Sequence, residues 1–83
     1  MELRDIAAIL MAQDPEGLIR TGAPADEYDS EAAQIQDILH KCDNVKDLQG
    51  FIMAIFKIQF GKGSRMNMEK ALTIANNIYD CII

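Results

Sequence analysis

The chain has 83 residues, of which 49% are hydrophobic and 25% charged, and its net charge is −5. This length suits one domain spanning residues 1–83, and the hydrophobic fraction is typical of a folded globular protein rather than a disordered one. No apolar run approaches the roughly 18 residues of a membrane span and no signal-peptide pattern is present, so we expect a cytoplasmic protein. The acidity argues against binding to nucleic acid, which requires a clustered basic surface.

Two helices are predicted in the first half of the chain. The first covers about residues 2–13, where apolar residues recur every three or four positions, and the pair Asp14-Pro15 ends it. The second begins near Asp29 or Ser30, both good N-cap residues, and its apolar positions run from Ala32 to Cys42. Residues 14–31 form a long loop that follows the first helix and leads into the start of the second.

Two further helices are predicted in the second half. The third covers residues 45–60, and we expect Phe51 and Ile58 to widen its buried face and Gly50 to lie at a close helix crossing. Gly61 is well placed to end it with positive φ, and a fourth helix runs from about residue 67 to the end. The connections after the second and third helices are short, so these neighbours should pack antiparallel. The sequence therefore predicts an all-α fold, a small four-helix domain with a long ordered loop between its first two helices.

The residues that usually carry enzyme chemistry are sparse. Cys42 and Cys81 lie on or near apolar helix positions and are interpreted as buried, inert thiols. His40 is the one histidine, and it has no partner at metal-ligand spacing. The stretch Gly61-Lys62-Gly63-Ser64 lacks the spacing and the preceding strand of a phosphate-binding loop, and is better interpreted as a basic turn between helices. We expect no enzymatic activity and no cofactor.

The loop at residues 14–31 holds both prolines and six of the thirteen acidic residues. Its first part matches a type I turn, with Asp14 first, Pro15 second and Gly17 fourth, followed by Leu18 and Ile19, which should anchor the loop on the core. Its second part is an acidic entry to a helix. Tyr28 lies there and either buries its ring with the hydroxyl hydrogen-bonded or presents it to a partner.

Three functional hypotheses follow. The first is a non-enzymatic protein-binding module that uses an acidic loop face against a basic protein partner, through Asp26, Glu27, Tyr28 and Asp29. The second is a site for a divalent cation, although the spacing is not that of an EF-hand. Its oxygen ligands would come from Asp14, Asp26, Glu27, Asp29 and Glu31. The third is a structural homo-oligomeric module that associates through a small apolar patch formed by Ile9, Ile82 and Ile83.

The loop also resembles a known motif. Its segments Asp14-Pro15-x-Gly17-Leu18-Ile19 and Gly22-Ala23-Pro24-x-Asp26-Glu27-Tyr28-Asp29 are similar to the pattern "DPxGLI…GAPxDEYD" of the YugE-like small bacterial domain-of-unknown-function family, over residues 14–29. The resemblance implies an all-helical, cytoplasmic bacterial protein without an established biochemical role. It further implies a likeness to the immunity proteins of bacterial toxin systems, and so a partner that is a toxin.

Overall fold

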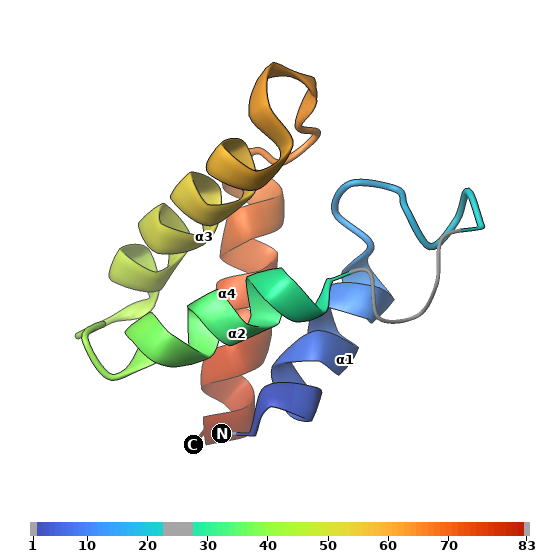
Figure 1. Cartoon of the computed structure of the whole chain (residues 1–83). Coiled ribbons are helices and arrows are strands. Elements are labelled where there is room, and N and C mark those ends of the chain that lie inside the picture. Colours follow the sequence, from blue (N-terminus) through green and yellow to red (C-terminus); the bar gives the residue numbers. More distant parts are fainter. Residues whose placement is uncertain (1, 23–27, 83) are drawn as a thin grey trace.

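The computed structural model describes residues 2–22 and 28–82, and this part of the chain contains helices and no strand (Figure 1). The four α-helices are α1 (Leu3–Gln13), α2 (Asp29–Leu39), α3 (Val45–Phe60) and α4 (Met68–Ile82), and a 3-10 turn, η1 (Gly61–Gly63), follows α3. The predicted all-α four-helix domain is therefore confirmed. No helix in the described ranges is long and apolar enough to cross a membrane.

The helices form a closed circuit of contacts. Helix α1 packs against α2 and α4, and helix α3 also packs against α2 and α4. Helices α3 and α4 run in opposite directions, as the short connection between them predicts (Figure 1). The long loop after α1 and the turn that carries η1 extend at the same end of α4 (Figure 1). This arrangement places two connections that are far apart in the sequence within reach of each other.

Local signals account for most of the helix boundaries. Before α3, the Asn44 side chain accepts a hydrogen bond from the Asp47 N–H at 2.9 Å, and the Asp47 carboxylate accepts one from the Asp43 N–H at 3.1 Å. The first bond is the N-cap bond of α3, and the second holds the residue before the cap against the first turn of the helix. Gly61 ends α3 at φ 65°, which a residue with a side chain rarely adopts. The prediction that Asp29 or Ser30 caps α2 is wrong, because Asp29 is the first helical residue and Tyr28 occupies the cap position.

The core lies between the four helices and is almost entirely aliphatic. Its fully buried large side chains include Ile6, Leu10, Tyr28, Ile35, Leu48, Ile52, Phe56, Ile74 and Ile78. On α4 the buried positions are Ala71, Ile74, Ala75 and Ile78, whereas Leu72 is 38% exposed. Leu18 and Ile19 are half-buried and pack against the edge of the core, so they anchor the loop as expected without entering the interior.

Two expectations for α3 are wrong. Phe51 is 40% exposed and Ile58 is 79% exposed, so neither widens the buried face of the helix. Gly50 is also exposed, and a Cβ built on it would meet nothing within 4 Å, so no close crossing requires a glycine there. The physical reason is that α3 is apolar on two sides, and only one side contacts α2 and α4.

Candidate functional site

The loop begins with a turn built around the carboxylate of Asp14. Asp14 ends α1 in the left-handed conformation (φ 45°, ψ 57°) rather than the extended conformation expected before a proline. The Gly17 N–H donates to the Asp14 carbonyl at 3.0 Å and closes the turn. The Asp14 carboxylate accepts hydrogen bonds from the N–H groups of Ile19 and Arg20, both at 3.0 Å. These bonds offset the cost of the left-handed backbone and fold the loop back over the end of α1.

Tyr28 closes this turn from inside the core. Its side chain has no exposed surface, and its ring lies 6.1 Å from the ring of Phe56, centroid to centroid. Its hydroxyl donates to Asp14 Oδ1 at 2.7 Å and accepts from the Glu16 N–H at 3.1 Å. Burial, together with the hydrogen bond to the Asp14 carboxylate, raises the pKa of Tyr28 to about 12. Of the two roles open to Tyr28, the structure supports the buried, hydrogen-bonded one.

The same hydrogen bonds act on Asp14. Burial on its own would raise the pKa of this carboxyl, but the hydrogen bonds from Tyr28, Ile19 and Arg20 favour the charged form. Their combined effect is larger, so the pKa of Asp14 is lowered from its ordinary value. Asp14 is therefore held as an ion that accepts three hydrogen bonds from within the loop.

Glu16 connects the loop to the turn between α3 and α4. Its side chain is only 7% exposed, and its carboxylate accepts from Ser64 Oγ at 2.5 Å and from the Arg65 N–H at 2.6 Å. The Ser64 hydroxyl in turn accepts from the Met66 N–H at 3.1 Å. A buried carboxylate is tolerated only when it is hydrogen-bonded in this way. Glu16 thus joins two connections that are separated by 48 positions in the sequence.

A lysine completes the junction. Lys70 Nζ donates to the carbonyl groups of Pro15 and Arg65, each at 3.0 Å. The Arg65 guanidinium lies over Gly17, where an added Cβ would come within 2.9 Å of Nη1. We call this polar junction the loop clamp. Its residues are Asp14, Pro15, Glu16, Gly17, Tyr28, Ser64, Arg65 and Lys70.

The loop clamp changes the interpretation of the predicted cation site. The Asp14 carboxylate is occupied by three donors, and Glu31 is buried on α2. Asp26 and Glu27 lie outside the described residues. In the part of the chain that the structure describes, no three potential metal-ligating side chains of histidine, cysteine, aspartate or glutamate lie together. Asp29, the remaining residue of the predicted set, is exposed at the start of α2.

Of the four predicted partner-binding residues, the structure describes Tyr28 and Asp29. Tyr28 cannot contact a partner in this conformation, because its side chain has no exposed surface. Asp26 and Glu27 are outside the described residues, and Asp29 is exposed. Among the described residues, Asp29 is therefore the exposed member of the predicted acidic face.

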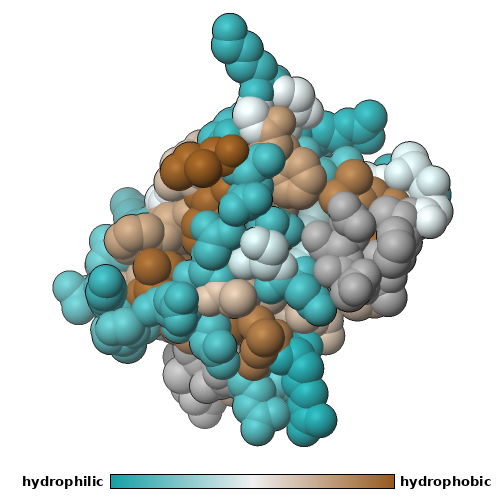
Figure 2. Space-filling model, viewed as in Figure 1, coloured by the Kyte–Doolittle hydropathy of each residue, from teal (hydrophilic) through white to brown (hydrophobic). Residues whose placement is uncertain are grey.

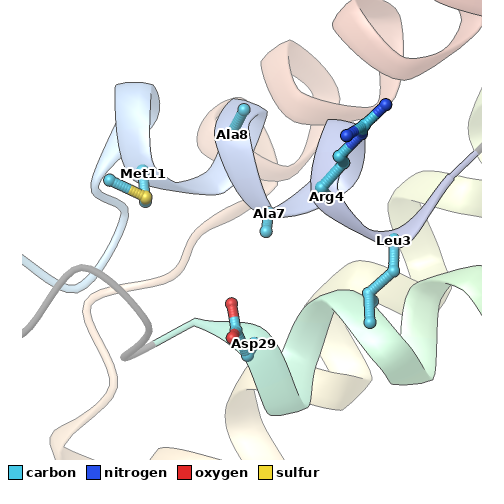
Figure 3. A pocket seen from close by; sticks show the side chains of 6 residues that line it. All are labelled: Leu3, Arg4, Ala7, Ala8, Met11 and Asp29. Atoms are coloured by element: carbon cyan, nitrogen blue, oxygen red, sulfur yellow. The ribbon is translucent and has the colours of Figure 1, made fainter.

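Asp29 borders a hollow between α1 and the start of α2. The hollow has a volume of about 300 Å³ and is shown in Figure 3. Its lining residues are Leu3, Arg4, Ala7, Ala8, Met11 and Asp29. The carboxylate of Asp29 points toward α1, whereas the long side chain of Arg4 extends away from it (Figure 3). The hollow combines an apolar wall from α1 with one negative charge from α2.

The hollow was not predicted from the sequence, because the apolar pattern of residues 2–13 marks one side of a helix without showing which part of it is covered. In the structure Ile6 and Leu10 are buried, whereas Leu3 is 39% exposed and Met11 only half-buried. The apolar side of α1 is thus wider than the surface that α2 and α4 cover. No local pattern shows which edge of such a side remains open.

The structure also tests the predictions for the two cysteines and for the Gly61–Gly63 stretch. Cys42 is half-buried, its Sγ donates to the Ile38 carbonyl at 3.5 Å, and burial raises the pKa of its thiol, as expected for an inert cysteine. Cys81 is exposed, so the prediction that it is buried is wrong. The Gly61–Gly63 stretch is an exposed turn between helices, which confirms the structural interpretation of that stretch.

Comparisons with protein-family models, with curated proteins and with solved structures find no match to this chain. The resemblance of residues 14–29 to the YugE-like family therefore stays a prediction.

Proposed function

We propose that this protein is a non-enzymatic binding module that holds a protein partner in the hollow between α1 and α2. The observation that carries the proposal is the hollow itself, an apolar wall of Leu3, Ala7 and Met11 with the exposed Asp29 carboxylate at its edge. Its volume of about 300 Å³ is at the lower end of the range for small-molecule sites, about 300–1,000 Å³. A partner side chain suits it better than a large cofactor.

The chemistry of the hollow selects one kind of partner group. A lysine or arginine has an apolar stem that packs on the α1 wall and a cationic head that pairs with Asp29. The net charge of −5 adds a weak general attraction for a basic partner and speeds its approach. The partner is therefore a protein with a basic side chain at the centre of its contact surface. A bacterial toxin is the form of this partner that the motif resemblance favours.

The test is site-specific photo-crosslinking in cells of the native host. A photo-reactive amino acid replaces Ala8, which is exposed and lines the hollow, and in a control variant it replaces Asn76, which is exposed on α4. We expect one protein to be captured at position 8 and not at position 76. The capture should be lost in an Asp29→Asn background and kept in an Asp29→Glu background.

Two results would contradict the proposal. Equal capture at both positions would show that the hollow is not the binding surface, and capture that ignores Asp29→Asn would remove the role of the carboxylate. Because Asp29 lies in the first turn of α2, its charge also stabilises the helix by about 0.3–1 kcal/mol. Circular dichroism of the Asp29→Asn variant confirms that the loss of capture is not a loss of fold.

A further inference from the structure

The outward side of α3 carries an unpartnered surface on different helices from the hollow just described. Six exposed residues recur there at intervals of three and four positions, which places them on one side of the helix. They are Asp47, Gly50, Phe51, Ala54, Lys57 and Ile58, and we call them the outer face of α3. Brown, hydrophobic atoms reach the surface over α3 (Figure 2), and Ile58 is the most exposed of the exposed large hydrophobic residues.

A depression lies in the N-terminal half of this face. It has a volume of about 410 Å³ and is lined by Lys46, Asp47, Gly50, Phe51 and Ala54. Gly50 has no side chain to fill it, and a Cβ placed there would meet nothing within 4 Å. A glycine inside a helix lowers stability by about 1 kcal/mol relative to alanine, and no contact within the chain requires it. An external helix that approaches closely at this point is the contact that a glycine would serve.

The positions of these residues are self-complementary. When two identical helices cross antiparallel at the level of Ile52, residues equally distant from Ile52 on either side face each other across the pair. Gly50 then faces Ala54 of the second copy, where both residues are small. The second pairing is electrostatic, because Asp47 faces Lys57 of the second copy, and the symmetry forms this opposite-charge pair twice.

The same register fills the depression. Lys46, at its N-terminal edge, is as far from Ile52 as Ile58 is on the other side. The exposed Ile58 of each copy therefore lies at the Lys46 edge of the depression of the other copy, about one helical turn from Gly50. A single arrangement therefore covers Ile58, the most exposed of the large apolar side chains, and also covers the depression.

We propose that a second copy of this chain docks on the outer face of α3, forming a two-fold symmetric, antiparallel α3–α3 dimer. One helix face covers less than the roughly 800 Å² per partner of a standard interface, so the dimer is weak and reversible. This dimer uses a different surface from the patch of Ile9, Ile82 and Ile83 that the sequence suggests. Ile9 is only half-exposed and packs against the core, and the side chains of Ile82 and Ile83 lie outside the described residues.

Sedimentation equilibrium over a wide range of protein concentrations tests the proposal. We expect the wild-type chain to shift from monomer to dimer as its concentration rises, and Ile58→Glu to remain monomeric throughout. The control is Met68→Glu, which places the same charge on an exposed apolar position of α4 and should dimerise like the wild type. A wild-type chain that stays monomeric, or a dimer that survives Ile58→Glu, overturns the proposal.

A charge exchange tests the register. Lys57→Glu places like charges opposite each other at both ends of the contact and should abolish the dimer. The double variant Asp47→Lys with Lys57→Glu restores opposite charges and should restore the dimer. If Lys57→Glu still dimerises, or if the double variant stays monomeric, the antiparallel arrangement is contradicted. Because Asp47 also accepts a hydrogen bond from the Asp43 N–H, thermal melting confirms that each variant is folded.

Discussion

Removal of the hydroxyl oxygen of Tyr28 should lower the free energy of unfolding by more than the loss of a single atom suggests. The Tyr28→Phe substitution keeps the ring that packs against Phe56 and deletes the hydroxyl. The Asp14 carboxylate then loses its shortest hydrogen bond, 2.7 Å long, and the Glu16 N–H loses its acceptor at 3.1 Å. The change therefore affects two partners at once, and one of them is charged.

The magnitude follows from these two losses. A hydrogen bond to a charged group contributes about 1.5–3 kcal/mol, and a buried N–H without an acceptor costs about 1–3 kcal/mol. Since water reaches part of the Asp14 side chain and replaces some of what it loses, we expect a net loss of about 2–3 kcal/mol in the free energy of unfolding. For a domain of this size that corresponds to a decrease in Tm of roughly 10–20 °C.

Urea denaturation followed by circular dichroism measures the change, with Tyr79→Phe as the matched control. Tyr79 is half-buried on α4, and within the described part of the chain no hydrogen bond to its hydroxyl occurs. Surface substitutions typically change the free energy of unfolding by up to about 0.5 kcal/mol. If Tyr28→Phe changes it by less than this, the loop clamp is not a stabilising unit.

The pH dependence gives a second, independent signature of the same hydroxyl. The pKa of Tyr28 is about 12 in the folded chain and 10.0 in its ordinary state, so its contribution is complete below pH 10 and is lost as the pH rises toward 12. The wild type should therefore lose stability over this alkaline range more steeply than Tyr28→Phe. In acid the direction is opposite, and stability is lost as the pH falls. Because the pKa of Asp14 is lowered in the folded chain, its carboxylate stabilises the fold at pH values above its ordinary pKa of 3.8. That contribution disappears as the pH falls through the folded value.

Three further substitutions test other parts of the structure by denaturant unfolding at low protein concentration. Gly50→Ala should raise the unfolding free energy by about 0.5–1 kcal/mol, because the position is helical, exposed and open; a loss would mean that the space is not free. Glu16→Gln should lower it by about 2 kcal/mol, since an amide nitrogen or a weaker neutral oxygen replaces a charged acceptor for Ser64 and Arg65; no change would remove Glu16 from the loop clamp. Gly17→Ala should lower it by about 1–2 kcal/mol, because φ is 74° there and a residue with a Cβ is strained in that conformation; a neutral result would refute the backbone strain.

The helices of this protein are predictable from sequence because their ends depend on residues within about four positions of each other. The Asn44 side chain caps α3 by accepting from the Asp47 N–H three positions later, and the bounds of α3 agree with the predicted range of 45–60. The predicted limits of α1 and α4 also agree with the observed limits to within one or two residues. These interactions are short in sequence, so a pattern of residue types is enough to identify them.

The loop clamp could not be predicted, because its bonds join distant positions through polar groups that have no periodicity. Glu16 reaches Ser64 and Arg65 across 48 and 49 positions, and nothing in either segment specifies the other. The buried side of α3 was ambiguous for a different reason. Both Phe56 and Ile58 belong to apolar sides of the helix, and only the position of its neighbours decides that Phe56 is buried and Ile58 is exposed.

The acidity of residues 14–31 has a different meaning once the fold is known. Four acidic residues of this stretch lie in the described part of the chain, and three of them, Asp14, Glu16 and Glu31, are partly or fully buried. Their charge serves the loop clamp and the start of α2, and Asp29 alone of these four is exposed. A hydrogen-bonded carboxylate keeps its charge, so these residues still contribute to the net charge of −5. Recognition at the α1–α2 hollow then depends on packing against Met11 and on one carboxylate, so the binding free energy should respond more to shape than to salt.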